Sequence, residues 1–299
     1  MTQAHRHTTH QHGTHAHGDH AHLASVLDLD AELLGSHIDD AATLIESALG
    51  RTPAHIVDLG AGTGTGTEVL ARRFPHARLT AVDSSPEMTA LIEQRARTAG
   101  FSSRLATVVA DLDDGLPQVA SPDVAWAAMS LHHVADPMSL LREIAAAVGP
   151  DGVVAIVEMA GVPQFLSGVE DDALRALEDR CHSASATAGW EALVDWTDAL
   201  DDAGYDVLRH ETIQVERDGP SQAVAQYARH WFGQYRHRLA DDLEPADLTL
   251  IDELVDPARP AALHRRDDLT LRAGRLIWIA RPRPAETRPA TTDSRNEAS

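Results

Sequence analysis

The segment Ile56-Val57-Asp58-Leu59-Gly60-Ala61-Gly62-Thr63-Gly64 joins an apolar, strand-like run to a helical one. At such a turn, residues without side chains let a ligand approach the backbone, and the helix N-terminus adds a partial positive charge. The glycines are spaced G-x-G-x-G, whereas the dinucleotide fingerprint needs a third glycine where this chain has Thr65 or Thr67. The carboxylate of Asp58 would repel a pyrophosphate, whereas it would attract a cation. The loop therefore predicts a ligand that carries no phosphate close to Asp58.

Strand-like and helical segments alternate around this turn. Strands are predicted for the apolar runs 55–58, 78–82, 105–109, 123–129 and 152–157, and helices for 29–49, 67–73, 86–99 and 137–148. In the second half, helices are predicted for 190–203, 221–239 and 246–255, and strands for 205–215 and 275–280. Uninterrupted apolar strands that alternate with helices indicate a doubly wound α/β fold, in which helices cover both faces of a parallel sheet.

The two ends of the chain differ in composition from the body. Residues 1–22 alternate His with Thr, Gly, Ala and Gln, and residues 282–299 are rich in Pro, Thr, Arg and Glu. Neither segment has enough apolar residues to offset the entropy lost on ordering, so both are predicted to be disordered tails. The body, 23–281, is interpreted as one domain, with a core at 54–159 and a helical elaboration at 160–268 before the last strand.

The ordered motifs of the core resemble those of the class I S-adenosylmethionine-dependent methyltransferases of the small-molecule type. The segment 58–64 resembles that family's first motif, and the second strand ends in Asp83-Ser84 about twenty residues later. Asp111-Leu112 after the third strand and the segment 129–134 after the fourth are similar to two further motifs. The resemblance covers about residues 54–159, and it implies a Rossmann-like sheet of seven strands with the last one antiparallel.

The resemblance also implies a role for each site residue. The cofactor S-adenosylmethionine would closely approach the backbone of Gly60, Ala61, Gly62 and Gly64. Asp58 would lie near the cationic methionine end of the cofactor. Asp83, followed by Ser84, would hold the ribose hydroxyls, and Asp111, followed by Leu112, the adenine amine. Met129 and Ser130 would line the floor beneath the methionine part. The helix around His37, which precedes the first strand, is expected to close the pocket.

His132 and His133 lie in the segment where an acceptor would meet the cofactor. Either imidazole is a candidate general base, because it titrates near neutral pH. The alternative is that both pack as scaffold, since a sulfonium methyl is already activated and alignment alone can carry the reaction. The aromatic cluster 231–235 is interpreted as core packing rather than an acceptor pocket.

Composition narrows the function further. A net charge of −21 disfavours nucleic-acid partners, and no apolar run approaches the ~20 residues of a membrane span. The lone Cys181 forms no internal disulfide, which favours a cytoplasmic location. The His-rich tract could capture a metal, but it has no Cys partners, so no metal site is predicted. The sequence does not indicate an oligomeric state.

We therefore expect methyl transfer from S-adenosylmethionine to a small-molecule acceptor. One alternative is a non-catalytic, cofactor-binding protein on the same fold, with a regulatory or metal-linked role. The other is an NAD-dependent oxidoreductase, which the glycine spacing disfavours.

Overall fold

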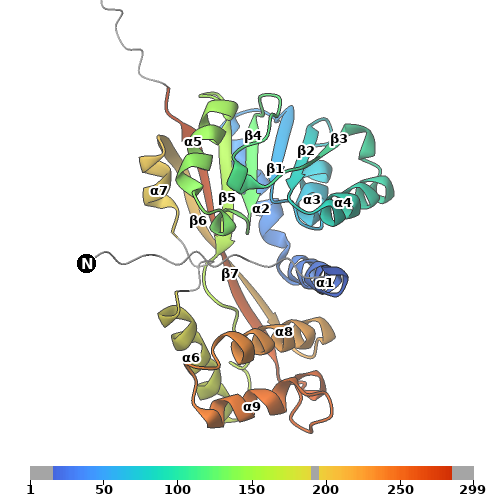
Figure 1. The fold of residues 1–299 in the computed structure, drawn as a ribbon, viewed down its shortest axis with the longest axis vertical. Coiled ribbons are helices and arrows are strands. Elements are labelled where there is room, and N and C mark those ends of the chain that lie inside the picture. Colours follow the sequence, from blue (N-terminus) through green and yellow to red (C-terminus); the bar gives the residue numbers. More distant parts are fainter. Residues whose placement is uncertain (1–15, 190–194, 285–299) are drawn as a thin grey trace, which may run out of the picture.

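A seven-stranded sheet forms the centre of the structure, a computed structural model that describes residues 16–189 and 195–284 (Figure 1). The strands are β1 (His55–Leu59), β2 (Arg78–Asp83), β3 (Leu105–Val109), β4 (Val124–Ala128), β5 (Val153–Met159), β6 (Tyr205–Asp218) and β7 (Thr270–Pro282). Their order in the sheet is β3-β2-β1-β4-β5-β7-β6. Only β7 runs antiparallel to its neighbours, β5 and β6, which confirms the predicted Rossmann-like sheet with an antiparallel last strand.

Helices cover both faces of the sheet, as the buried apolar strands require. On one face, α2 (Ser36–Leu49), α3 (Thr65–Arg73) and α4 (Pro86–Ala99) pack on Ile56, Leu79 and their neighbours. On the other face, α5 (Pro137–Val148) and α7 (Thr197–Asp202) pack on residues of the opposite parity, such as Val57 and Ala125. Successive side chains of a strand point to opposite faces, so one apolar run supplies both cores.

A second, helical lobe lies beyond one end of the sheet (Figure 1). The long strands β6 and β7 extend into it, where Val215 and Leu271 join its core. Its helices are α6 (Asp172–Thr187), α8 (Gln222–Arg238) and α9 (Pro245–Val255), and residues of α1 (Ala16–Leu34) pack against it. Short 3-10 turns occupy Ser102–Arg104, Leu112–Asp114, Leu131–His133 and Leu263–Arg265.

The N-terminal region differs from the sequence prediction. The single helix expected at 29–49 is two helices, which meet at Gly35. Helix α1 begins at Ala16, inside the tract that was expected to be disordered up to residue 22, so that boundary is corrected. The expectations for residues 1–15 and 285–299 lie outside the described residues.

The helical lobe also differs from the sequence prediction, which expected one helical elaboration before the last strand. It is built from two insertions, because α6 precedes β6 whereas α8 and α9 lie between β6 and β7. Helix α6 was not predicted. Of the helix expected at 190–203, residues 190–194 are outside the described residues and α7 begins only at Thr197. In the parts of the chain that are described, no helix is both long and apolar enough to cross a membrane.

Candidate functional site

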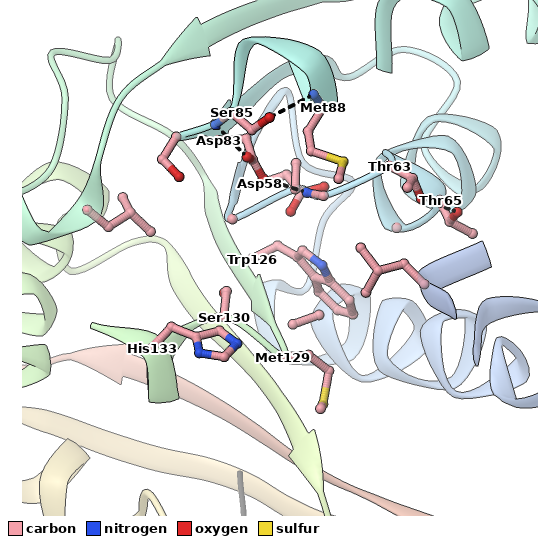
Figure 2. Close-up of a pocket in the computed structure, with 18 of the residues that line it drawn as sticks. Asp58, Thr63, Thr65, Asp83, Ser85, Met88, Trp126, Met129, Ser130 and His133 are labelled. Carbon is pink, nitrogen blue, oxygen red and sulfur yellow. Dashed lines mark hydrogen bonds between the residues drawn. The ribbon is translucent and has the colours of Figure 1, made fainter. Parts of the chain in front are cut away.

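A cavity of about 490 Å³ opens at the carboxyl ends of β1, β2, β3 and β4. In the strand order, β1 and β4 are neighbours at the point where the chain reverses its direction across the sheet. Open α/β sheets bind ligands at this switch point. The residues that follow the four strands line the cavity, together with α1 and α2 from the N-terminal region (Figure 2).

The loop after β1 uses most of its amides within the protein. The amides of Gly60 and Ala61 both donate to the carbonyl of Val82, at 2.9 and 3.0 Å, and the amide of Gly64 donates to the carbonyl of Ala61. The amide of Gly62 donates to Asp83 Oδ2 at 2.8 Å. A phosphate site needs several free amides at such a loop, so this geometry is poorly suited to a dinucleotide.

Three glycines of the loop have positive φ angles, of 72°, 55° and 79° for Gly60, Gly62 and Gly64. A Cβ on Gly60 would lie 2.5 Å from the Cβ of Ser130, and one on Gly64 would lie 2.8 Å from Ile92 in α4. Gly60 and Gly62 line the cavity, but Gly64 does not. Gly64 packs the start of α3 against α4, and its approach to a ligand stays a prediction.

Asp83 is held at the end of β2 by two backbone donors. Its Oδ2 accepts from the amide of Gly62 at 2.8 Å, and its Oδ1 accepts from the amide of Ser85 at 2.9 Å (Figure 2). A carboxylate offers about four acceptor positions, so each oxygen keeps capacity for a ligand. Asp83 and Ser84 both line the cavity, where the sequence placed them.

Asp58 also lines the cavity and is only 3% exposed. The Thr67 hydroxyl donates to its Oδ2 at 2.5 Å. Burial raises the pKa of Asp58 to about 7, against the hydrogen bond from Thr67, and the neighbouring Asp83 raises it further. Because burial makes the ionised form of Asp58 costly, a nearby cation would stabilise that ionised form.

Beyond β4, the backbone turns sharply to form the floor of the cavity. Met129 has a φ of 56°, a left-handed conformation that is uncommon for a residue with a side chain. The hydroxyl of Ser130 donates to the carbonyl of Leu59 at 2.7 Å and so ties the end of β4 to the end of β1. Met129, Ser130 and the buried Trp126 line the cavity (Figure 2).

The two candidate histidines separate in the structure. His133 lines the cavity, whereas His132 does not. His132 Nδ1 lies 2.8 Å from Oε2 of Glu158, a fully buried carboxylate of β5, and the two imidazole rings lie 4.0 Å apart between centroids. Sequence reasoning missed Glu158, because nothing local to β5 shows that its end faces the segment after β4.

Asp111 and Leu112 line the cavity on the side of β3. Asp111 Oδ1 accepts from the amide of Asp113 at 3.0 Å and so starts a 3-10 turn. Ala61 completes the predicted residues that line the cavity; of the predicted set, only Gly64 and His132 lie elsewhere.

The N-terminal wall of the cavity was largely missed. Leu27, Asp30 and Ala31 of α1 and His37 and Ile38 of α2 line it. Only the neighbourhood of His37 was expected there, and the spacing of a helix that precedes β1 carries no signal for where it packs. The aromatic cluster 231–235 behaves as predicted, since Phe232 and Tyr235 lie in the core of the helical lobe. Within residues 16–189 and 195–284, no group of three or more His, Cys, Asp or Glu is placed to hold a metal ion.

Comparison with known proteins shows what part of the core is similar to. Residues 56–152 match the model of a methyltransferase domain. The trans-aconitate 2-methyltransferase of Variovorax paradoxus is 34% identical over 135 residues, or 44% of this chain and 50% of the relative. The chain thus covers about half the length of that relative. The enzyme of the same name from Methylobacterium radiotolerans is 28% identical, over 74% of this chain and 77% of the relative.

A solved protein from Bacillus halodurans supports the fold alone. It is 14% identical, with a TM-score of 0.50, and the match covers 82% of this chain and all of that one, at 100%.

Proposed function

We propose that this chain, whose residues 56–152 match the model of a methyltransferase domain, is a class I S-adenosylmethionine-dependent methyltransferase that transfers a methyl group to a small-molecule acceptor. The cofactor of this family is S-adenosylmethionine, whose sulfonium supplies an activated methyl group when it is bound. The observation that carries the proposal is Asp83, a carboxylate that two backbone amides hold at the cavity beside the glycine loop.

The residues of the cavity fit this cofactor. Asp83 retains acceptor capacity for the two ribose hydroxyls, and Asp111 for the adenine amine. Asp58 is the carboxyl that a cationic methionine end would stabilise in its ionised form. The loop 60–62 and the segment 129–130 form the surfaces on which the nucleoside and the methionine part would rest, and Ser84 and Leu112 complete the lining.

The protein would then promote the reaction by aligning the acceptor with the methyl group and by excluding water. An aligned nucleophile and an activated methyl need little further help, because alignment alone can remove much of the barrier. His133 is the imidazole that lines the cavity, and it is the group we assign to accept a proton from the acceptor where one must leave. His132 is held by Glu158 and would position its neighbour.

Titration with S-adenosylhomocysteine tests this function. The variant Asp83→Ala should bind it at least roughly tenfold more weakly than the wild type, about 1.4 kcal/mol, because a charge-assisted pair of hydrogen bonds is lost. Asp83→Asn keeps an acceptor oxygen and should lose less. Asp40→Ala, which removes an exposed carboxylate of α2, is the matched control.

Equal affinity of the wild type and Asp83→Ala would contradict the proposal. Normal binding without turnover across a broad acceptor panel would favour the non-catalytic alternative. Tight binding of NAD in place of S-adenosylhomocysteine would favour the oxidoreductase. The net charge of −21 supports a small molecule over a nucleic acid as partner, and the single buried Cys181 supports a reducing, cytoplasmic setting.

A further inference from the structure

The segment of α1 that lies over the cavity is weakly packed. Every residue from 24 to 32 is half-buried or exposed, whereas the next two, Leu33 and Leu34, are buried in the core of the helical lobe. A groove of about 810 Å³ runs between this part of α1 and α4. Segments with few buried apolar contacts open at a lower free energy than the rest of a fold. The polar contacts of α1 therefore decide how firmly this segment is held.

Asp28 ties the segment to the glycine loop. Its Oδ1 accepts from the hydroxyls of Thr63 and Thr65, at 2.9 and 3.3 Å, and from Nη2 of Arg95 in α4, at 2.8 Å. The two threonine hydroxyls lie 3.2 Å apart where the loop enters α3 (Figure 2). Arg95 also holds the loop itself, because its Nε donates to the carbonyl of Thr63 at 3.0 Å, and its Nη1 donates to Glu68 in α3. One polar cluster thus joins α1, the loop, α3 and α4.

The cation and the anion of this cluster face away from the cavity. Thr63 and Thr65 line the cavity, but Asp28 and Arg95 do not. The side chain of Asp28 is 52% exposed and that of Arg95 is 29% exposed. An ion pair this close to solvent contributes little free energy, so it can break and form again readily. Asp28 therefore holds α1 in place without being part of the surface that a ligand in the cavity would meet.

Leu27, the neighbour of Asp28, lies over the loop on which the cofactor would rest. A Cβ on Gly62 would lie 3.3 Å from Cδ1 of Leu27, so α1 approaches the loop closely at this point. Leu27, Asp30 and Ala31 form the part of the cavity wall that α1 supplies. A ligand that rests on the loop would lie beneath α1, and α1 must move for it to enter or leave on this side.

The inner part of α1 has a firmer attachment. Asp30 Oδ1 accepts from Arg275, whose side chain is 1% exposed, and from the hydroxyl of Tyr227, at 2.5 and 2.6 Å. Solvent and salt screen a buried pair much less than an exposed one. The two attachments are therefore unequal, and release of Asp28 lets the outer part of α1 leave the loop while the inner part stays in place.

Building on the proposed function, we propose that residues 24–29 of α1 form a gate over the cofactor site, and that Asp28 is the positioning residue that latches this gate to the glycine loop. Opening breaks the contacts of Asp28 with the two threonines and Arg95, and S-adenosylmethionine and S-adenosylhomocysteine pass only when these contacts are broken. The latch holds α1 in the same way with and without a ligand beneath it. It therefore sets the rates of ligand exchange and leaves the affinity unchanged.

Stopped-flow binding of S-adenosylhomocysteine to the full chain tests the gate. Tryptophan fluorescence reports binding, since Trp126 lines the cavity. In Asp28→Ala the association and dissociation rate constants should both rise by about fivefold, as expected for the loss of an exposed ion pair, while Kd stays within about twofold of the wild type. Asp28→Asn retains an acceptor for the threonine hydroxyls but loses the charge, so its rate constants should be intermediate. A residue that only supports the bound ligand would raise the dissociation rate constant alone and weaken the affinity.

Asp39→Ala is the matched control. Asp39 is an exposed carboxylate of α2 that pairs with Arg72 of α3 at 3.3 Å and does not line the cavity. Both rate constants should remain at the wild-type values in this variant. Hydrogen exchange followed by mass spectrometry gives a second measurement. Asp28→Ala should speed the exchange of the amides of residues 24–29, whereas Asp39→Ala should not, and unchanged exchange in the sheet reports that both variants fold.

Unchanged rate constants in Asp28→Ala would overturn the gate, and so would a rise in the dissociation rate constant alone. Either result leaves the proposed function standing, because that function requires only that the cofactor binds in the cavity. A wild type that fails to bind S-adenosylhomocysteine would instead remove the proposed function.

Discussion

At the scale of single residues, the position of Asp58 in the fold determines the ionisation of its carboxyl group in the cavity. Its position at the end of the buried strand β1 leaves it 3% exposed, with Thr67 as its hydrogen-bond donor. Burial raises its pKa to about 7. Near neutral pH the carboxyl is therefore divided between neutral and ionised forms, and a cationic ligand would favour the ionised form.

The affinity for S-adenosylmethionine should consequently depend on pH. Below pH 7 the free protein holds a proton on Asp58 that the cation displaces, so affinity should rise with pH, by at most about tenfold per unit, and level off above the pKa. Calorimetric titration from pH 5.5 to 8.5 measures this slope. Asp58→Asn should flatten it, and S-adenosylhomocysteine, which lacks the sulfonium charge, should show a weaker slope. The same slope in Asp58→Asn would refute the role of this carboxyl.

At the scale of elements, the sequence predicted the part of the fold with strong local signals. Helices α4 and α5 match the predicted 86–99 and 137–148 residue for residue, because a proline opens each and a glycine follows each. Helix α6 was missed although Leu174, Leu177 and Cys181 repeat at helical spacing behind the cap Asp171. The break at Gly35 was not predictable, since it lies inside a continuous helical pattern.

The residues that line the cavity likewise divide into those that the sequence predicted and those that depend on tertiary packing. Residues that follow the strands were found, because their place follows from the topology of the sheet. The wall formed by α1 depends on tertiary packing against α8 and β7, which no local pattern records.

Gly35 is required where α1 meets α2 over the cavity. A Cβ at this position would lie 2.3 Å from the carbonyl oxygen of Ala31, a backbone atom that cannot move without shifting α1. Gly35→Ala should therefore destabilise the protein by about 1–3 kcal/mol, as overpacking does, although alanine is the better helix former. Urea unfolding measures the change, with affinity for S-adenosylhomocysteine as a second readout.

Gly233→Ala in α8 provides the matched control. Its Cβ would meet no atom within 4 Å, so the propensity of alanine should stabilise the protein by up to about 1 kcal/mol. If Gly35→Ala gave the same stabilisation, the junction of α1 and α2 would not be as tight as described.

At the scale of the whole molecule, one cluster of hydrogen bonds joins α1 to β7 and α8. Arg275 of β7 and the hydroxyl of Tyr227 in α8 both donate to Oδ1 of Asp30 in α1, at 2.5 and 2.6 Å. Burial works against the charge on Asp30, yet Arg275 and Tyr227 outweigh it, so the pKa of Asp30 is lowered. This cluster fixes α1 against the sheet and the helical lobe, and so positions the N-terminal wall of the cavity.

Removal of one partner should cost more than removal of both. Asp30→Leu leaves the guanidinium of Arg275, which is 1% exposed, without its anion and should destabilise the protein by about 3–5 kcal/mol. The double variant Asp30→Leu, Arg275→Met should recover a large part of this loss, because no charge then remains unpaired. Unfolding free energies of the two single variants and the double variant complete the cycle. Additive losses would show that the two charges do not depend on each other.

The most direct measurement of the central claim is an experimental structure of the complex with S-adenosylhomocysteine. The nucleoside should rest on the loop 60–62 with both ribose hydroxyls within hydrogen-bond distance of Asp83, and with Met129 and Ser130 beneath the homocysteine part. A complex in which the ligand lies elsewhere, or in which Asp83 faces away from the sugar, would contradict it.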